Sequence, residues 1–361
     1  MPAILDRIPI PAPALFLVAA ALASDAWPKL YDLVSVQTAE RVAIVALVVI
    51  LFDGGLDIGW RRVRTALAPV LSIGIAGTFL TAGAVAWFCH LVLGLDWTVS
   101  ALIGAALAPT DPAVTFAVLG GREIEGRSGT VLEGEAGFND PAGIALMAGM
   151  IELATHDDAT GWVIGKEFLV QMLVGAAFGV LGTRLARPAV RRAPAAALVV
   201  AGVLYALTAL AGGSGFLAVF LLGLRLADER LAIPRFQAHL AGAAEVAVFV
   251  ALGLTIHLDA LGVRDWWQGL AIFGVLALIA RPAIVALTLG RADLARNEKA
   301  FIAWSGLKGA VPILLAATAL LHHVDSGPKI YGLVFVVVLA SVVVQGTLVP
   351  VVAARLRIPM R

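Results

Sequence analysis

The sequence predicts an all-α protein that crosses a membrane about twelve times. Sixty per cent of its 361 residues are hydrophobic and only 14% are charged, and the mean hydropathy is +0.95. A soluble domain carries about one quarter charged residues. The charges also gather in short belts between apolar runs of about 16 to 27 residues, the length that an α-helix needs to cross a hydrocarbon core of about 30 Å. We therefore expect one polytopic transmembrane domain over residues 1–361, with no soluble regulatory domain.

Each apolar run is interpreted as one membrane span. The first run has three prolines in its lead-in, but it lacks the basic start and the small-residue cleavage site of a signal peptide, so we retain it as a helix. The predicted spans lie near residues 10–24, 40–58, 66–93, 97–119, 129–153, 165–186, 194–211, 213–228, 239–261, 266–289, 298–323 and 329–354.

Lysine and arginine set the predicted orientation, because they gather on the cytoplasmic side of a membrane. With the N-terminus inside, nineteen of the 26 basic residues fall in inner segments and five in outer segments. The remaining two, Arg281 and Lys308, lie within spans. The sequence therefore predicts two cytoplasmic termini and an integral protein of a prokaryotic inner membrane.

Two features recur at nearly one offset. Asp57 and Asp259 end the second and the ninth span, 202 residues apart, and Pro109 and Pro312 interrupt the fourth and the eleventh, 203 residues apart. Partners separated by seven spans insert with opposite topology, as in the inverted repeats of secondary transporters. We expect two inverted five-helix repeats with discontinuous crossing helices, at about 8–153 and 213–354, joined by linker helices at about 165–211.

Two carboxylates lie inside these apolar runs, Asp111 in the fourth span and Asp140 in the fifth. A charge at bilayer depth costs on the order of 3 kcal/mol, and such acids usually mark an ion or proton path. Pro109 and Pro112 each remove a backbone donor, so the chain near Thr110 should unwind and leave carbonyl oxygens free. Carboxylate, hydroxyl and carbonyl oxygens suit an alkali cation. The alternative for each proline site is a simple packing kink.

A second interruption is expected in the eleventh span, at Gly306-Leu307-Lys308-Gly309-Ala310-Val311-Pro312. Lys308 places a fixed cation beside it. The ammonium group can neutralise either the negative end of a broken helix or an acid in the opposite half of the protein.

The fifth span carries several polar residues on one helix. Glu135 and Asn139 are four residues apart and share a face, whereas Asp140 is turned about 100° further round. Arg281 is the expected partner of Glu135, in a pair that we interpret as structural, because a lone guanidinium in a span is very costly. Asp140 then faces a cavity; its alternative role is that of a hydrogen-bonded structural acid. Glu133 lies nearer the inner surface.

These residues carry a resemblance to a known family. The sequence resembles the monovalent cation/proton antiporter-1 family, the NhaP and sodium/proton-exchanger group, and is most similar to its potassium/proton branch. Four motifs occur in the family's order over about residues 8–354: Leu51-Phe52-Asp53-Gly54-Gly55-Leu56, Pro109-Thr110-Asp111-Pro112, Glu133-Gly134-Glu135 followed by Asn139-Asp140-Pro141, and Ser305 through Pro312.

The resemblance implies a NhaA/NapA-like antiporter fold and a homodimer. In that arrangement a six-helix core, spans three to five and ten to twelve, moves against a dimerising scaffold. It also implies roles for single residues: cation ligation by Asp140, Asp111 and Thr110, orientation by Asn139, a nearby acid at Asp53, an ion pair between Glu135 and Arg281, and charge compensation by Lys308.

The sequence departs from the family pattern at several points. Members commonly have Ser where this chain has Ala136, which removes one oxygen ligand. Lys308 replaces an Arg, keeping the charge and losing the bidentate fork. We also expect neither the extra N-terminal helix of many relatives nor a C-terminal regulatory domain.

The resemblance and the residues together predict secondary active, electroneutral exchange of one monovalent cation, K⁺ or Na⁺, for one proton. Asp140 would hold either ion, and Asn139 stands where electrogenic relatives of this fold have a second acid. A cation channel and a transport-inactive membrane subunit remain alternatives. An intramembrane aspartyl protease is a remote third, because no Gly-x-Gly-Asp motif surrounds either acid.

Other ligands and partners are not expected. No Gly-rich phosphate loop points to a nucleotide, and nothing indicates nucleic acid, a cofactor or an enzyme. The six histidines show no ligand spacing, so no metal is expected beyond the transported alkali cation. Membrane lipid is the remaining partner.

Overall fold

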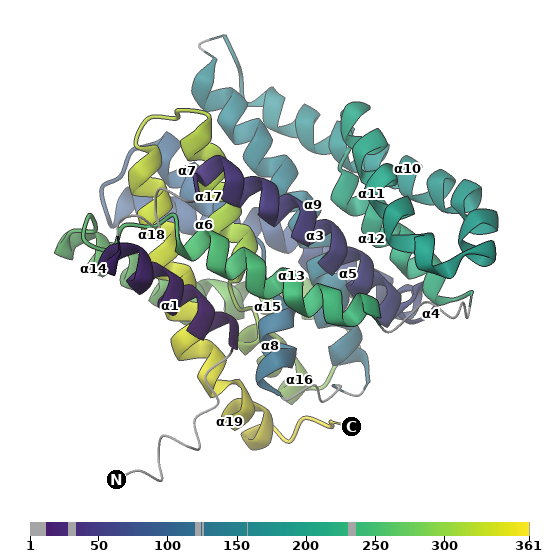
Figure 1. Cartoon of the computed structure of the whole chain (residues 1–361). Helices are drawn as coiled ribbons and strands as arrows, with labels where there is room; N and C mark the ends of the chain where they lie inside the picture. The colour runs from purple at the N-terminus through teal and green to yellow at the C-terminus, as the bar shows by residue number, and fades with distance from the viewer. Residues whose placement is uncertain are drawn as a thin grey trace.

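The computed structural model describes residues 12–27, 34–119, 124, 126–156, 158–229 and 236–360, and over these the protein is built from helices (Figure 1). The predicted first span, about 10–24, and the predicted first repeat, about 8–153, therefore begin outside the described residues. Six basic residues also lie outside them: Arg7, Lys29, Arg122, Arg230, Arg235 and Arg361. The main helices are α1 (Ala12–Ala26), α3 (Val36–Ile58), α4 (Trp60–Val63), α5 (Leu67–Leu71), α6 (Gly77–Leu91), α7 (Trp97–Ala106), α8 (Pro112–Val118), α9 (Arg127–Thr155), α10 (Trp162–Arg192), α11 (Ala197–Leu210), α12 (Gly215–Ala227), α13 (Phe236–Gly253), α14 (Val263–Val275), α15 (Arg281–Leu289), α16 (Arg296–Trp304), α17 (Ala310–Leu321), α18 (Gly327–Ala340) and α19 (Thr347–Arg355).

Four apolar stretches of helix are long enough to cross a membrane. They are Trp60–Leu91, Trp162–Arg192, Val263–Leu289 and Gly327–Arg355, each of 27 to 32 residues. At 1.5 Å per residue, 27 residues of helix extend about 40 Å, which exceeds the hydrocarbon thickness. Other apolar helices of the described residues, such as Ala12–Ala26 and Gly215–Ala227, are shorter. The protein is thus an all-helical membrane protein.

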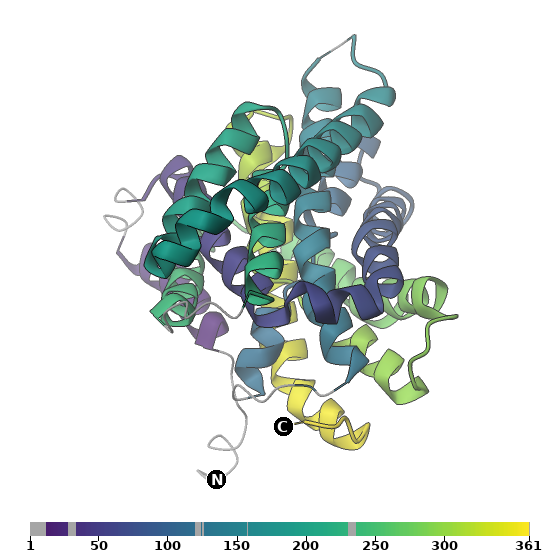
Figure 2. The same cartoon turned by 90° about the vertical axis from the view of Figure 1, so that its right-hand side faces the viewer.

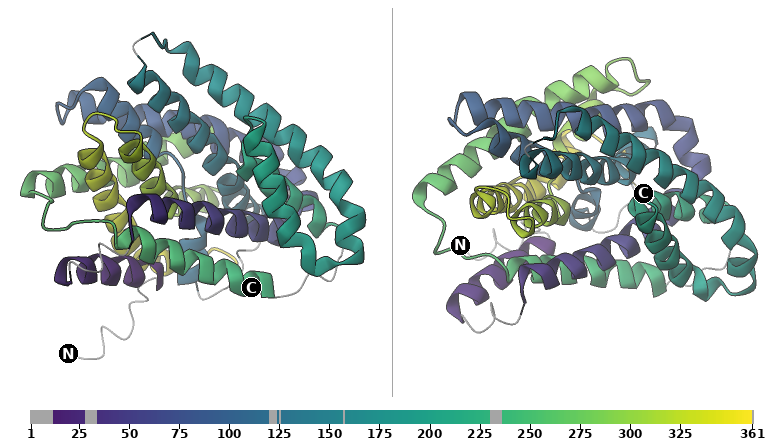
Figure 3. Two further views of the ribbon diagram at one scale, coloured as in Figure 1. Left: turned by 45° about the horizontal axis from the view of Figure 1, so that its top comes forward. Right: turned by 90° about the horizontal axis from the view of Figure 1, so that it is seen from above.

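One group of helices forms a layer along one side of the molecule. Helix α3 packs against α12 and α13, and α1 packs against α13. Figure 3 shows α1, α3 and α13 side by side along one edge in the view from above. The long helix α10 and α11 complete this group by packing on α12. We call α1, α3 and α10–α13 the scaffold group.

The remaining helices form a second group around α9. Helix α9 contacts α7 and the π-helical turn Ser72–Ala76, while α18 packs on α14 and α17. Figure 2 shows α9 running through the molecule, with α10 lying across its outer side. The two groups meet where α9 contacts α10 and where α17 contacts α3 and α13. We call α4–α9 and α14–α19 the core group.

Three long helices of the core group contain a π-helical turn. The turns lie at Ser72–Ala76, Leu276–Ala280 and Ser341–Gly346. A π turn widens the helix by one residue and often marks a functional region. The second turn ends directly before Arg281, and the third supplies Ser341, so both adjoin the polar residues of the fold's interior.

Candidate functional site

Two interrupted helices meet inside the core group. Helix α7 ends at Ala106 and α8 begins at Pro112, while α16 ends at Trp304 and α17 begins at Ala310. The extended segments between them are joined by a hydrogen bond of 2.8 Å, which the backbone N–H of Asp111 donates to the carbonyl of Leu307. The interruption predicted between Pro109 and Pro112 is confirmed.

The second interruption falls in the predicted segment from Gly306 to Pro312, at its glycine end. Residues 305–309 form the break, and Pro312, which we expected to mark it, is the third residue of α17. A proline in the first turn of a helix replaces an N–H that has no helical partner, so it is tolerated there. The glycines Gly306 and Gly309, on either side of Leu307 and Lys308, accompany the break.

Asp111 stands at the start of α8 and closes the helix end. Its Oδ1 accepts a hydrogen bond of 2.9 Å from the backbone N–H of Ala113, the usual role of an N-cap aspartate. Its Oδ2 lies against Gly309, where a β-carbon would come within 1.9 Å of it. Asp111 is partly exposed. The carboxylate is therefore fixed by one oxygen and presents the other at the contact between the two breaks.

Lys308 neutralises the end of α7. The side chain is 2% exposed, and its Nζ donates to the carbonyls of Ala108, at 3.1 Å, and Pro109, at 2.8 Å. Carbonyls beyond a helix end carry partial negative charge, and the ammonium group also interacts with the charges of Asp140 and Glu135, so its surroundings fit both of the roles predicted for Lys308. Two carbonyls expected to be free for a cation are thereby engaged by the ammonium group.

A hydrogen-bonded chain from the third π turn holds Lys308 in place. The Lys308 backbone N–H donates to Ser341 Oγ at 2.9 Å, and Ser341 donates to Gln345 Oε1 at 3.1 Å. Gln345 in turn donates through Nε2 to the carbonyl of Trp304, the last residue of α16. One turn of helix therefore fastens both ends of the second break.

Glu135 and Arg281 form a buried, two-fold ion pair. Arg281 Nη1 donates to Glu135 Oε1 at 2.6 Å and Nη2 donates to Oε2 at 2.7 Å. Arg281 is 4% exposed and Glu135 is 1% exposed. This bidentate geometry joins α9 to α15 and is the strong form of an arginine–carboxylate pair. Gly306 leaves the room for it, because a β-carbon there would lie 2.4 Å from Arg281 Nε.

Thr110 links this ion pair to Asn139. Its hydroxyl donates to Glu135 Oε1 at 3.1 Å and accepts from Asn139 Nδ2 at 2.7 Å. Glu135 and Asn139 lie on one face of α9, as predicted. The threonine hydroxyl therefore has its proton engaged, and one lone pair remains for any further ligand.

Asp140 lies beside this network. The residue is 7% exposed, and its Oδ1 is buried without a hydrogen-bond partner among the described residues. Its charged neighbours are Asp111, Lys308 and Glu135. Buried polar atoms are nearly always paired, so an orphaned carboxylate oxygen between two broken helices indicates a place for an ion or a proton.

Asp53 lies away from these contacts. It is half-buried on α3 of the scaffold group, and its acidic neighbour is Asp57. Across the described part of the chain it shares no hydrogen bond or ion pair with Asp111 or Asp140. The structure thus brings together seven of the eight residues singled out from the sequence: Thr110, Asp111, Glu135, Asn139, Asp140, Arg281 and Lys308.

The sequence analysis missed a further charged neighbour, Glu245 on α13. Its Oε1 is buried without a hydrogen-bond partner among the described residues, and its charge interacts with that of Asp111. The signal was present, because Glu245 is a lone acid in a long apolar run, the same pattern that identified Asp111. Ser341 and Gln345, two polar residues in the apolar last span, were missed as well.

Comparison with known proteins places this geometry in a family. Residues 1–355 match the family described as "Sodium/hydrogen exchanger, transmembrane". The chain is 33% identical to the K(+)/H(+) antiporter NhaP of Alkalimonas amylolytica, an alignment covering 98% of this chain and 64% of that protein. It is 32% identical to the K(+)/H(+) antiporter NhaP2 of Shewanella sp. (strain ANA-3), over 94% of this chain and 62% of that protein. The chain thus spans just under two thirds of the length of these relatives.

A solved structure has the same fold. The sodium proton antiporter MjNhaP1 from Methanocaldococcus jannaschii superposes with a TM-score of 0.81, covering 98% of this chain and 94% of that one at 24% identity. The fold class expected from the resemblance is therefore shown at the level of the whole helical arrangement.

Proposed function

Because this chain belongs to the transmembrane sodium/hydrogen exchanger family, we propose that it is a secondary active antiporter that exchanges a monovalent cation, K⁺ or Na⁺, for a proton. The names of the two curated relatives favour K⁺ as the cation. The observation that carries the proposal is the Asp140 carboxylate, which is buried beside two crossing helix breaks with one oxygen unpaired in the described protein.

The cation is bound between Asp140 and Asp111. Asp111 Oδ2 and Asp140 Oδ1 supply hard oxygen ligands, and Thr110 adds its remaining lone pair. Asn139 holds the threonine hydroxyl in position through its amide, which is an orienting role. Ala136 stands where relatives commonly have a serine hydroxyl, so in this proposal a water molecule completes the coordination of the cation. Asp53 and Glu245 draw cations toward the site from the scaffold group.

Exchange follows from competition for one carboxylate. Asp140 carries a proton or, together with Asp111, a dehydrated cation, and each loaded form is less costly at bilayer depth than the bare charge. The core therefore changes its orientation when loaded. Lys308 and Arg281 stay with the helix end and with Glu135 throughout, so they keep the broken helices together without taking part in the exchange.

The architecture that supports this motion is a pair of inverted repeats with about twelve spans. Element boundaries recur along the chain: α3 and α13 begin at residues 36 and 236, α4 and α14 at 60 and 263, and α9 and α18 at 127 and 327. The two helix breaks, 107–111 and 305–309, and two of the π turns recur at similar offsets. In this proposal the core group rocks against the scaffold group, as in other transporters with broken helices at the midplane.

The scaffold group supplies the dimer contact. Its helices α10 and α11 expose large apolar side chains, among them Trp162, Leu173, Leu185, Val203 and Leu210, which fit lipid or a second copy. Both termini face the cytoplasm of a prokaryotic cell and the protein lies in the plasma membrane, in keeping with the excess of basic residues in inner segments.

Proteoliposomes test the proposal directly. The purified protein is reconstituted with an acidic lumen and a trapped pH dye, and K⁺, Na⁺, Li⁺ or Rb⁺ is added outside. We expect alkalinisation of the lumen with K⁺ or Na⁺. Asp140→Asn, which keeps the shape and removes the charge, should abolish the response while the protein remains folded in size-exclusion chromatography. A wild-type rate in this variant would show that Asp140 is not the exchange site.

A further inference from the structure

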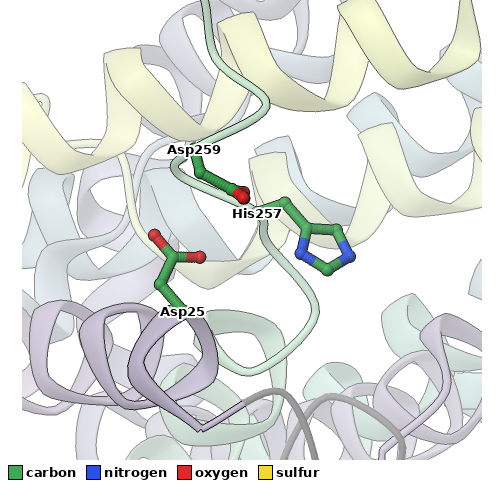
Figure 4. Close-up of side chains that lie close together, drawn as sticks. All are labelled: Asp25, His257 and Asp259. Atoms are coloured by element: carbon green, nitrogen blue, oxygen red, sulfur yellow. The ribbon is translucent and has the colours of Figure 1, made fainter.

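Three potential metal ligands converge at one end of the scaffold group, away from the site described above. Asp25 comes from the C-terminal end of α1, and His257 and Asp259 come from the loop between α13 and α14. One ligand atom of each lies within 4.8 Å of the other two. Figure 4 shows the two carboxylates directed toward each other, with the imidazole beside them. We call these three residues the loop cluster.

Two hydrogen bonds hold the loop against α1. The backbone N–H of Leu258 donates to Asp25 Oδ1 at 3.1 Å, which leaves Oδ2 of Asp25 available. Ser24 Oγ donates to the carbonyl of Leu254 at 3.0 Å, a second contact between the same two segments. A ligand carboxylate that is already hydrogen-bonded is oriented before the ion arrives.

We propose that Asp25, His257 and Asp259 bind a divalent transition-metal ion of the Zn²⁺ class. One imidazole nitrogen with two carboxylate oxygens is a ligand set that suits Zn²⁺ and its neighbours in the first row, whereas Ca²⁺ and Mg²⁺ prefer oxygen alone. Three protein ligands leave a fourth tetrahedral position for water.

Distance and charge both fit such an ion. Ligand atoms bound to tetrahedral Zn²⁺ at about 2.1 Å lie about 3.4 Å apart, so the cluster must close by little more than about 1 Å. His257 and Asp259 are exposed. The carboxylates of Asp25 and Asp259 repel each other at this distance, and a divalent cation between them offsets the repulsion by attracting both.

Binding would fasten α1 to the connection that leads from the scaffold group into the core group. His257 and Asp259 lie in the connection between α13 and α14, and Asp25 lies on α1, so a bound ion would stabilise this end of the described structure against unfolding. The inference concerns metal binding alone and does not depend on the proposed exchange.

The test uses the full chain without a histidine tag, in detergent, with Zn²⁺ titrated by calorimetry and Co²⁺ followed by its visible absorption. We expect one Zn²⁺ per chain and a tetrahedral Co²⁺ spectrum. His257→Ala and Asp259→Asn should each weaken binding by at least about tenfold. The matched control is the double variant His322→Asn, His323→Asn, which removes the adjacent exposed histidines of another loop and should bind like the wild type.

Two results would overturn the inference. One is Zn²⁺ affinity that is unchanged in His257→Ala, and the other is affinity that is lost in the His322, His323 control. Thermal unfolding of each variant without metal shows how far the substitution alone changes stability. If His257→Ala does not fold, His257→Gln takes its place.

Discussion

Thr110 is the residue whose role changes most between sequence and structure. The Pro109-Thr110-Asp111-Pro112 motif suggests a hydroxyl free to bind a cation, but that hydroxyl already bridges Glu135 and Asn139. The spacing within α9 indicates that Glu135 and Asn139 share a face. The spacing does not indicate that Thr110 lies against this face of α9, because that contact depends on how the interrupted segment packs. Single roles were predictable here, and the shared hydrogen bond was not.

Breaking the buried ion pair should destabilise the protein. Arg281→Ala leaves the Glu135 carboxylate buried without its cation, with only the Thr110 hydroxyl as a partner. We expect a loss of about 3 to 5 kcal/mol, as for other buried pairs from which one partner is removed. Thermal unfolding of the detergent-solubilised variants measures it. Adding Glu135→Gln should recover part of the loss, whereas strictly additive losses would mean that the two residues do not stabilise each other.

Removing the charge of Glu245 should weaken cation binding. This acid on α13 lies within electrostatic reach of Asp111, and its negative charge favours a cation there. Glu245→Gln keeps the shape, so the cation concentration for half-maximal exchange should rise about three- to tenfold, corresponding to about 1 kcal/mol. Glu245→Asp keeps the charge and is the matched control. Identical half-maximal concentrations in wild type and Glu245→Gln would remove Glu245 from the ion path.

At the scale of elements, the two helix breaks differ in how well the sequence predicts them. Pro109 and Pro112 frame the first, and the helix stops between them. The second is set by Gly306 and Gly309, while Pro312 is accommodated inside the first turn of α17. A proline does not fix a break by itself: Pro112 and Pro312 both lie in the first turn of the helix that follows a break, and Pro141 lies inside α9 without interrupting it. The stronger signal was the pair of glycines.

Gly309→Ala should separate the two breaks. The added methyl group would lie 1.9 Å from Asp111 Oδ2, so either the carboxylate or the backbone has to move. Overpacking of this kind costs about 1 to 3 kcal/mol, and displacement of Asp111 should reduce exchange more than tenfold. Gly274→Ala on α14 is the control, because its β-carbon meets no atom within 4 Å. Equal activity of the two variants in proteoliposomes would contradict the described contact.

At the scale of the whole molecule, long apolar runs predicted the helices well because a membrane protein must hide its backbone in helix wherever it meets lipid. Orientation and the inverted repeat were predicted from charge and from spacing, and both stay predictions. The division into scaffold and core groups could not be worked out from the residues alone, since apolar side chains that face lipid and those that face protein are of the same types. Glu245 could have been singled out as a lone acid in an apolar run, but its place near Asp111 depends on which helices pack together. The loop cluster escaped prediction because it too depends on that packing.

The last prediction is that exchange is electroneutral, and it rests on Asn139. Asn139 has no charge and donates to Thr110, so Asp140 is the single unpaired carboxylate of α9 at the crossing. If that carboxylate carries one proton in one direction and one monovalent cation in the other, the same charge crosses each way. The membrane potential then does no work on the cycle, although it would contribute about 2.3 kcal/mol per 100 mV for each net charge moved.

Exchange in proteoliposomes should therefore keep its rate under a potential clamped with a selective ionophore, and a solid-supported membrane should record no current. A cation-evoked current that disappears in Asp140→Asn would instead mean that a second proton is carried, with Asp111 and Glu245 as the groups to replace next.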